Sequence, residues 1–349
     1  MGFHVDYINT GEFESYEELR EKVIEARMRD NPDLPERSVE REVRNLSDLE
    51  IENEAVKRDI LIYQDETHIP KVVSEILDNW EFQSQNRKFN AILTVKYKSR
   101  VIAYYYEMKK QMKQRGRMLN VAMTFSIGNE NGDTSEDNMQ TVPDEVLEEM
   151  LADYGAFTNL ELSVEDIKAG KKNDYFEDLI ERAKCGGSGI SQKNIDLVIV
   201  ADQLLTGYDS KRLNTLYVDR NLELQSLIQA YSRTNRLFGK EKEFGTIINF
   251  QYPELTRASV LTAIKLYGSG GTNSKVLVDT YAVAVTKFSD LVEEMVQALS
   301  EPTQWEELLY HQKEKTIFLK AYRAVVEQLN CLQQYYEYAW DNERFGIDE

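Results

Sequence analysis

Five short runs of apolar residues, separated by segments of helical spacing, constrain the fold of this 349-residue sequence most. Each run is continuous in apolar character, which is typical of strands buried on both faces of a parallel sheet. Helical spacing between most of the runs then predicts an α/β domain in which strands and helices alternate. The runs lie at 90–95, 120–125, 196–201, 215–219 and 246–250.

The sequence on either side of these runs has a purely helical character. Residues 1–85 carry apolar residues at helical spacing, and we expect a helical lead-in there. After Pro253 the apolar residues again recur at three and four, which predicts an all-α helical domain over 253–349. A polar stretch at about 128–172 interrupts the α/β region 86–252, and we interpret it as an insertion at the edge of the sheet.

The charge of the chain limits the partners that it can bind. With 61 acidic against 42 basic residues, the formal net charge is −19, which counts against broad, non-specific binding of nucleic acid but allows a local groove of Arg and Lys. The acidic runs are typical of solvated helix faces. The sequence has no run of 18 apolar residues that would predict a membrane span, and no basic start before an apolar core that would predict a secretory signal.

Cysteine and histidine usage gives no indication of metal or disulfide chemistry. Cys185 and Cys331 lie far apart in sequence, so we expect neither a disulfide scaffold nor a cysteine metal site. The three histidines are too scattered to indicate a metal cluster or a catalytic triad. Together these features predict a protein of the reducing cytoplasm.

The segment from Asp196 to Arg236 carries the residues that indicate chemistry. The third apolar run ends in a loop that contains Thr206, Gly207 and Asp209. Ligands bind at the carboxyl ends of strands in open parallel sheets. There a glycine allows the close approach of a phosphate backbone, and a threonine hydroxyl can donate to it. Taken alone, Thr-Gly-Tyr-Asp is more typical of an ordinary turn.

Two arginines follow in the same segment. Arg233 and Arg236 are three apart on an expected helix, so their guanidinium groups share one face. Such a pair suits the γ-phosphate of a nucleotide, whose charge it can stabilise during transfer. A pair of this spacing also occurs on ordinary solvated helix faces. Here the loop and the arginine pair occur together, in this order, after buried strands. This combination favours a functional site over an ordinary turn and an ordinary helix face.

This segment resembles motifs V and VI of superfamily-two helicases. Gln229-Ala-Tyr-Ser-Arg-Thr-Asn-Arg236 fits the form Gln-x-x-x-Arg-x-x-Arg of motif VI. More narrowly, residues 196–250 resemble the R subunit (the motor and restriction subunit) of type I restriction enzymes. The resemblance is weaker over 89–125, where 90–95 corresponds to the motif IV strand, and loose over the first 80 residues. It implies a RecA-like second motor domain, reached by a connection from the first motor domain and followed by a helical domain.

The resemblance implies roles for the matching residues in binding and hydrolysing ATP. Arg236 becomes the arginine finger toward ATP bound on the first motor domain, and Arg233 lies beside it as a second catalytic arginine. Gln229 and Asp209 join the two arginines in contacting or sensing the nucleotide.

A second group of residues is implied in coupling the nucleotide to DNA. Thr206 and Gly207, together with Asp209, couple the state of the nucleotide to the DNA strand. Thr94, near the end of the motif IV strand, is a further candidate for contact with the DNA backbone.

The sequence also lacks parts that the resemblance requires for a complete enzyme. No G-x-x-x-x-G-K-[ST] occurs, so the phosphate-cradling loop is absent, and no counterpart of the endonuclease core can be placed. We therefore expect a C-terminal piece of a larger type I site-specific deoxyribonuclease with ATPase activity. ATP and Mg²⁺ would be bound mainly by the first motor domain, and the piece alone would not hydrolyse ATP. The implied partners are double-stranded DNA, the first motor domain, and the modification and specificity subunits.

Other interpretations remain open at the level of sequence. The chain could be the second motor domain of another superfamily-two helicase or remodeller, or a non-catalytic module that docks on partner subunits. Asp65-Glu-Thr-His68 has the form of a DEAH box, but no phosphate loop precedes it, and its flanks predict a continuous helix. The tyrosines at 104–106 and 335–338 could stack on bases, although packing between helices is the commoner use.

Overall fold

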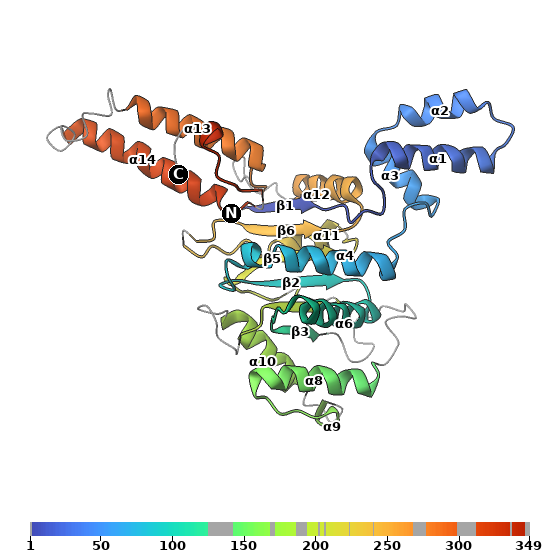
Figure 1. Ribbon diagram of the computed structural model, residues 1–349, viewed down its shortest axis with the longest axis horizontal. Helices are drawn as coiled ribbons and strands as arrows, with labels where there is room; N and C mark the ends of the chain where they lie inside the picture. Colours follow the sequence, from blue (N-terminus) through green and yellow to red (C-terminus); the bar gives the residue numbers. More distant parts are fainter. Residues whose placement is uncertain are drawn as a thin grey trace.

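A six-stranded parallel sheet forms the centre of the computed structural model (Figure 1). The strand order is β1-β6-β5-β2-β4-β3, and every neighbouring pair is parallel. The strands are β1 (Phe3–Tyr7), β2 (Asn90–Val95), β3 (Val121–Thr124), β4 (Leu197–Val200), β5 (Leu213–Asp219) and β6 (Gly245–Asn249). The structure describes residues 2–124, 142–167, 172–185, 194–201, 203–205, 207–222, 224–239, 241–267, 277–298, 312–335 and 337–345.

The five strands that the apolar runs predict are all present. Strands β2 to β6 are buried along their whole length, which explains why their sequences are continuous apolar runs. Strand β2 lies between β4 and β5, with Thr94 opposite Val200 on one side and Val218 on the other. The expected α/β fold class, a RecA-like parallel sheet flanked by helices and followed by an all-α part, is confirmed.

Strand β1 corrects the interpretation of residues 1–85 as a helical lead-in. It pairs with β6 in parallel, with Phe3 opposite Gly245 and Tyr7 opposite Asn249, and so forms one edge of the sheet. Only the first part of the strand is buried. An edge strand does not require apolar residues on both faces. Because β1 contains the polar residues His4 and Asp6, it does not form a continuous apolar run in the sequence.

Helices from three parts of the chain share the core of the sheet. In Figure 1, α4 and α6 lie in front of the strands and α11 lies behind them. Helix α4 falls within the expected lead-in, yet it contributes Val72 to this core. Helix α12 falls within the expected helical domain, yet it contributes Ala263. The helices are α4 (Asp65–Asp78), α5 (Trp80–Ser84), α6 (Lys98–Arg115), α11 (Leu224–Tyr231) and α12 (Pro253–Tyr267).

The first three helices form a unit with an apolar core of its own. They are α1 (Tyr16–Asp30), α2 (Glu36–Arg44) and α3 (Asp48–Lys57), and they lie beyond the carboxyl ends of the strands (Figure 1). Buried Glu52 joins the unit to α12, because its two carboxylate oxygens accept from the backbone N–H groups of Glu254 and Leu255. A carboxylate at the first turn of a helix satisfies donors that have no partner within the helix and complements the helix dipole.

Near β3, at the other edge of the sheet, lie α8 (Asp144–Thr158), α9 (Val164–Asp166) and α10 (Lys172–Cys185) (Figure 1). The hydroxyl of Tyr175 on α10 donates to the carbonyl of Met123 in β3 at 2.8 Å. The expected insertion at about 128–172 lies partly outside the described residues.

The C-terminal helices lie at the opposite end of the strands from α1 to α3 (Figure 1). Helices α13 (Tyr281–Gln297) and α14 (Gln312–Leu332) pack as a pair, and α15 (Asn342–Phe345) lies against α13. Their apolar core includes Phe288 and Tyr335, and it also takes in Phe244, the residue before β6. The buried Tyr335, like Tyr104 and Tyr105 of α6, packs between elements.

Candidate functional site

Arg233 braces the loop that follows β4. Its Nε donates to the carbonyl oxygens of Leu205 at 3.2 Å and of Gln229 at 3.1 Å, and its Nη1 donates to that of Tyr208 at 3.1 Å. A guanidinium fork that binds three backbone carbonyls fixes the path of the loop and ties it to α11. These three hydrogen bonds direct the Arg233 guanidinium toward the protein, whereas the sequence predicted that this guanidinium faces a nucleotide.

Arg236, like Arg233, follows α11, which ends at Tyr231, so the prediction that the two arginines share a helix face is wrong. The Nε of Arg236 donates to Oδ1 of Asp209 at 2.7 Å, and the two side chains are 45% and 62% exposed. Gly207, two residues before Asp209, is exposed and has a φ of +76°, a conformation that glycine adopts without strain. The structure thus brings three sequence-predicted residues, Gly207, Asp209 and Arg236, to one exposed surface.

The other sequence-predicted residues have different surroundings. Gln229 is partly buried on α11 and contributes its carbonyl to Arg233. Thr206 lies outside the described residues. Thr94 is fully buried inside β2, so in this conformation its hydroxyl cannot reach a nucleic-acid backbone. The prediction of a DNA contact by Thr94 therefore requires correction: the residue fills the interior of the sheet.

Lys242 is a residue near this site that the sequence did not single out. It is fully buried, and its Nζ donates to the carbonyl oxygen of Leu213 at 2.6 Å. Burial, and then the charge of nearby Arg236, lowers its pKa to about 7 from 10.5. The run Gly239-Lys-Glu-Lys242 looks like an ordinary solvated turn in the sequence, so no local signal could have found this buried lysine.

A second polar cluster lies inside the protein at the carboxyl end of β5. Asp219 is fully buried, and one of its carboxylate oxygens, Oδ1, lies 2.6 Å from Nε2 of His68 and accepts from Gln251 at 2.8 Å. Its other oxygen, Oδ2, accepts from the hydroxyl of Tyr104 at 2.6 Å and lies 3.0 Å from Nη2 of Arg100. Burial alone would raise the pKa of Asp219, but the hydrogen bond and charge of His68 and the charge of Arg100 hold it below the ordinary value.

His68 belongs to the sequence Asp65-Glu-Thr-His68, which forms the first turn of α4. The imidazole is fully buried between Asp219 on one side and the hydroxyl of Thr10 on the other, 2.8 Å from Nδ1. Two internal partners occupy both ring nitrogens. This DEAH-like sequence therefore ties α4 to the sheet.

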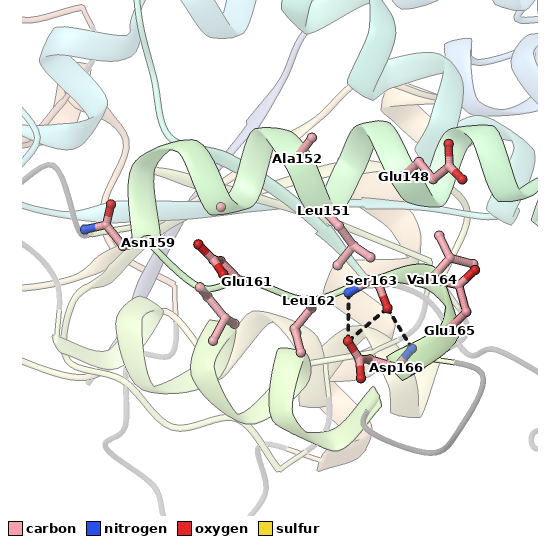
Figure 2. Close-up of a pocket in the computed structure, with 12 residues that line it drawn as sticks. Glu148, Leu151, Ala152, Asn159, Glu161, Leu162, Ser163, Val164, Glu165 and Asp166 are labelled. Carbon is pink, nitrogen blue, oxygen red and sulfur yellow. Dashed lines mark hydrogen bonds between the residues drawn. The ribbon is translucent and has the colours of Figure 1, made fainter.

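A pocket of about 780 Å³ lies between α8 and α9, away from these residues (Figure 2). Glu148, Glu161, Glu165 and Asp166 line it, so its charge is negative, and Figure 2 shows Ser163 and Asp166 hydrogen-bonded to each other across the first turn of α9. Its lining contains no residue that the sequence predicts for nucleotide or DNA. An acidic pocket is also a poor match for phosphate groups.

Two features were not found in the described part of the chain. It contains no group of three or more His, Cys, Asp and Glu side chains placed to hold a metal ion. Nor does any helix within the described ranges combine the length and apolar character that crossing a membrane requires.

Taken together, the sheet and the loop define a class of protein. The parallel sheet has helices on both faces, and the two arginines follow α11, the helix after β5. This is a RecA-like α/β domain, joined to helical units at both ends of the strands. Family models identify the chain further. Residues 87–252 match the model of type I restriction enzyme subunit R domain 3, and residues 276–349 match that of the type I restriction and modification enzyme subunit R C terminal. The chain belongs to the R subunits of type I restriction enzymes and matches their C-terminal part.

Individual relatives agree with this family. The chain is 28% identical over 349 residues to the type I restriction enzyme SauCOLORF180P endonuclease subunit of Staphylococcus aureus strain COL, covering 100% of this chain and 33% of that protein. It is also 28% identical over 354 residues to the SsaAORF53P endonuclease subunit of Staphylococcus saprophyticus, again covering 100% of this chain and 33% of the relative. The chain thus spans about a third of the length of these relatives.

A solved structure, the C-terminal part of the Fun30 ATPase domain, overlaps this chain loosely. The TM-score is 0.29 at 10% identity, over 75% of this chain and 71% of that one. An overlap at that level adds nothing to the fold described above.

Proposed function

We propose that this chain is the second motor domain of an ATP-driven DNA translocase, the motor of a type I restriction enzyme. Arg236 supplies the positive charge that stabilises the γ-phosphate of ATP during hydrolysis. The observation that carries the proposal is the contrast between the two arginines. Arg233 is bound to backbone carbonyls of the loop after β4, whereas Arg236, which follows α11, is exposed and pairs with Asp209 of that loop.

The roles of the two arginines then differ. An arginine finger must reach a nucleotide held on a separate domain, and the exposed guanidinium of Arg236 is free to do so. Arg233 acts indirectly: its guanidinium holds the carbonyls of Leu205 and Tyr208, and this positions Asp209, the ion-pair partner of Arg236. We assign Arg233 as a positioning residue.

The remaining parts of the reaction belong to other domains and subunits. ATP and Mg²⁺ are held mainly by the first motor domain, because a phosphate-cradling loop is absent from this sequence. Closure of the two domains over ATP brings Arg236 to the γ-phosphate, and their opening and closing moves the protein along duplex DNA. In the complete enzyme the same subunit carries the endonuclease, and the modification and specificity subunits are its partners.

The test uses the full-length subunit in its complex with DNA. Arg236→Ala should lower ATP turnover by roughly 10³-fold or more, as the loss of an arginine finger does elsewhere. The matched control is Arg257→Ala, because Arg257 is 51% exposed and also forms an ion pair with a carboxylate, that of Glu254 at 3.2 Å. Near-normal turnover by Arg236→Ala, in a subunit that remains folded, contradicts the proposal.

A second candidate function, docking on partner subunits, has one observation in its favour. The paired helices α13 and α14 expose large apolar side chains, including Val296 at 52% and Ile317 at 59%. Exposed apolar side chains gathered on a projecting helix pair favour a protein interface. Ile317→Glu should weaken assembly with the other subunits while leaving the sheet domain folded; unchanged assembly argues against docking through this pair.

A further inference from the structure

A cavity of about 470 Å³ opens at the carboxyl ends of β2, β5 and β6. Among the ten described residues that line it, three are basic, Lys96, Arg100 and Arg220, and none is acidic. The chain as a whole has a formal net charge of −19, so this lining departs locally from the average. Concave sites lined by one sign of charge concentrate ions of the opposite sign. The cavity therefore favours an anion.

Different elements of the fold hold the three cations. Lys96 directly follows β2, Arg220 directly follows β5, and Arg100 lies in the first turn of α6. The Nη1 of Arg220 donates to the carbonyl oxygens of Val95 at 3.3 Å and of Ala201 at 2.8 Å. These carbonyls lie at the ends of two neighbouring strands, so the sheet itself fixes the guanidinium at the cavity.

Arg100 is held from the side of the protein interior. Its Nη2 lies 3.0 Å from Oδ2 of buried Asp219 and 3.1 Å from Oδ1 of Asp65, and its side chain is 11% exposed. The Nε of Arg100 is also buried, and within the described part of the chain it makes no hydrogen bond. A buried donor on a charged group costs free energy when it has no acceptor, and an anion in the cavity would offer one.

Lys96 completes the lining from the exposed side. Its ammonium lies 4.7 Å from the centre of the Tyr97 ring, and no ion pair joins it to a carboxylate among the described residues. Tyr252, which also lines the cavity, has a φ of +48°, a backbone conformation that is strained for tyrosine. Residues in such conformations cluster at binding sites, where the surrounding structure maintains the strain.

We propose that this cavity binds a phosphate group of a nucleic-acid backbone. Arginine and lysine at the carboxyl edge of a parallel sheet are the groups and the place expected for phosphate contacts. The site is separate from Gly207, Asp209 and Arg236, and its ligand rests on the proposed function because DNA is the substrate there. A free phosphate compound presents the same oxygen atoms, so the experiment must distinguish the two sources.

The experiment titrates fluorescein-labelled duplex DNA against the 349-residue chain at several salt concentrations between roughly 50 and 200 mM. Lys96→Gln removes one exposed cation from the cavity, and Asn221→Asp adds a negative charge to the lining without changing the size of the side chain. We expect Lys96→Gln to weaken binding several-fold and to reduce the slope of log K against log salt by about 0.9. Asn221→Asp should weaken binding at least as much. The matched control, Lys113→Gln, removes an exposed lysine near the end of α6 and should change neither quantity.

The outcomes separate this proposal from the proposed motor function. Equal affinities and equal salt slopes for the unaltered chain and Lys96→Gln overturn the cavity as a DNA site and leave the Arg236→Ala test untouched. A different result would favour a free phosphate compound and overturn the nucleic-acid assignment. In that result, pyrophosphate raises the Tm of the unaltered chain but not that of Lys96→Gln, and duplex DNA does not bind. Loss of DNA binding in Lys96→Gln with normal ATP turnover in Arg236→Ala would keep the cavity and reject the motor.

Discussion

The Nε of Arg236 lies 2.7 Å from Oδ1 of Asp209, and both side chains remain largely exposed. An exposed ion pair of this kind contributes only about 0–1 kcal/mol. The pair is thus strong enough to bias the direction of the guanidinium and weak enough for a phosphate to displace the carboxylate. Such a pairing would keep Arg236 near its working position when no nucleotide is bound.

Replacing Asp209 should therefore have a small effect on catalysis. In the full-length subunit, Asp209→Ala removes an ion pair that contributes up to about 1 kcal/mol to holding Arg236 in position. This corresponds to a fall in ATP turnover of no more than about fivefold. Steady-state ATPase assays check this, with Glu254→Ala as the control that breaks the exposed pair with Arg257. A fall as large as that of Arg236→Ala would mean that Asp209 contacts the nucleotide itself.

Arg233 should affect folding more than its neighbour does. Arg233→Ala leaves the carbonyls of Leu205 and Tyr208 without their donor, and we expect a loss of about 1–3 kcal/mol in the free energy of unfolding. Arg233→Lys should recover only part of it, because one ammonium cannot reproduce the planar fork. Urea denaturation measures both. If Arg236→Ala destabilises the chain as much as Arg233→Ala, the distinction between brace and finger is wrong.

The buried cluster at Asp219 should be sensitive to the loss of one charge. Asp219→Asn removes the carboxylate that His68 and Arg100 face, and breaking a buried pair costs about 3–5 kcal/mol. Asp209→Asn, the same change at an exposed position, is the control and should cost less than about 1 kcal/mol. Equal losses measured by urea denaturation would show that the cluster adds no stability beyond that of an exposed pair.

The same cluster predicts how the free energy of unfolding changes at acid pH. Because the pKa of Asp219 is lowered in the folded protein, its contribution is fully present above the ordinary pKa of 3.8 and is lost as the pH falls through the folded value. The free energy of unfolding should therefore fall more steeply toward acid in the unaltered chain than in Asp219→Asn. Parallel curves for the two proteins would contradict the lowered pKa.

The sequence predicts those parts of the fold that depend on local patterns. Strands β2 to β6 are buried on both faces, so each must be apolar throughout and is visible as a run. Strand β1 lies at an edge and contains His4 and Asp6, so its position depends on β6, far along the chain. The loop with Gly207 and the exposed Arg236 follow from a short motif. The role of Arg233 depends on the path of the loop, which no spacing rule gives.

Contacts between distant residues account for the rest of what the sequence did not predict. His68 and Asp219 are 151 positions apart, so nothing near either residue indicates that they meet. The cations of the phosphate cavity follow two separate strands and begin one helix, and only the order of strands in the sheet brings them together. Burial of Lys242 likewise depends on packing against the start of β5.

Lys242 gives the last prediction, a dependence of stability on alkaline pH. Its pKa is about 7 in the folded protein and 10.5 ordinarily, so between these values the unfolded chain holds a proton that the folded chain has released. The free energy of unfolding must therefore rise with pH across this window, by up to a few kcal/mol (each unit of pKa is about 1.4 kcal/mol), and below pH 7 this lysine adds no slope.

Removing the buried amine should remove this rise. Lys242→Met keeps the length of the side chain but does not titrate, so its free energy of unfolding should change less between pH 7 and 10, as measured by urea denaturation. Lys113→Met, at an exposed position, should retain the rise of the unaltered chain. Because the charge of Arg236 helps to lower the pKa of Lys242, Arg236→Ala should shift the start of the rise to higher pH. Identical curves for the unaltered chain and Lys242→Met would show that the buried lysine keeps its proton, and the link between Lys242 and Arg236 would then be lost.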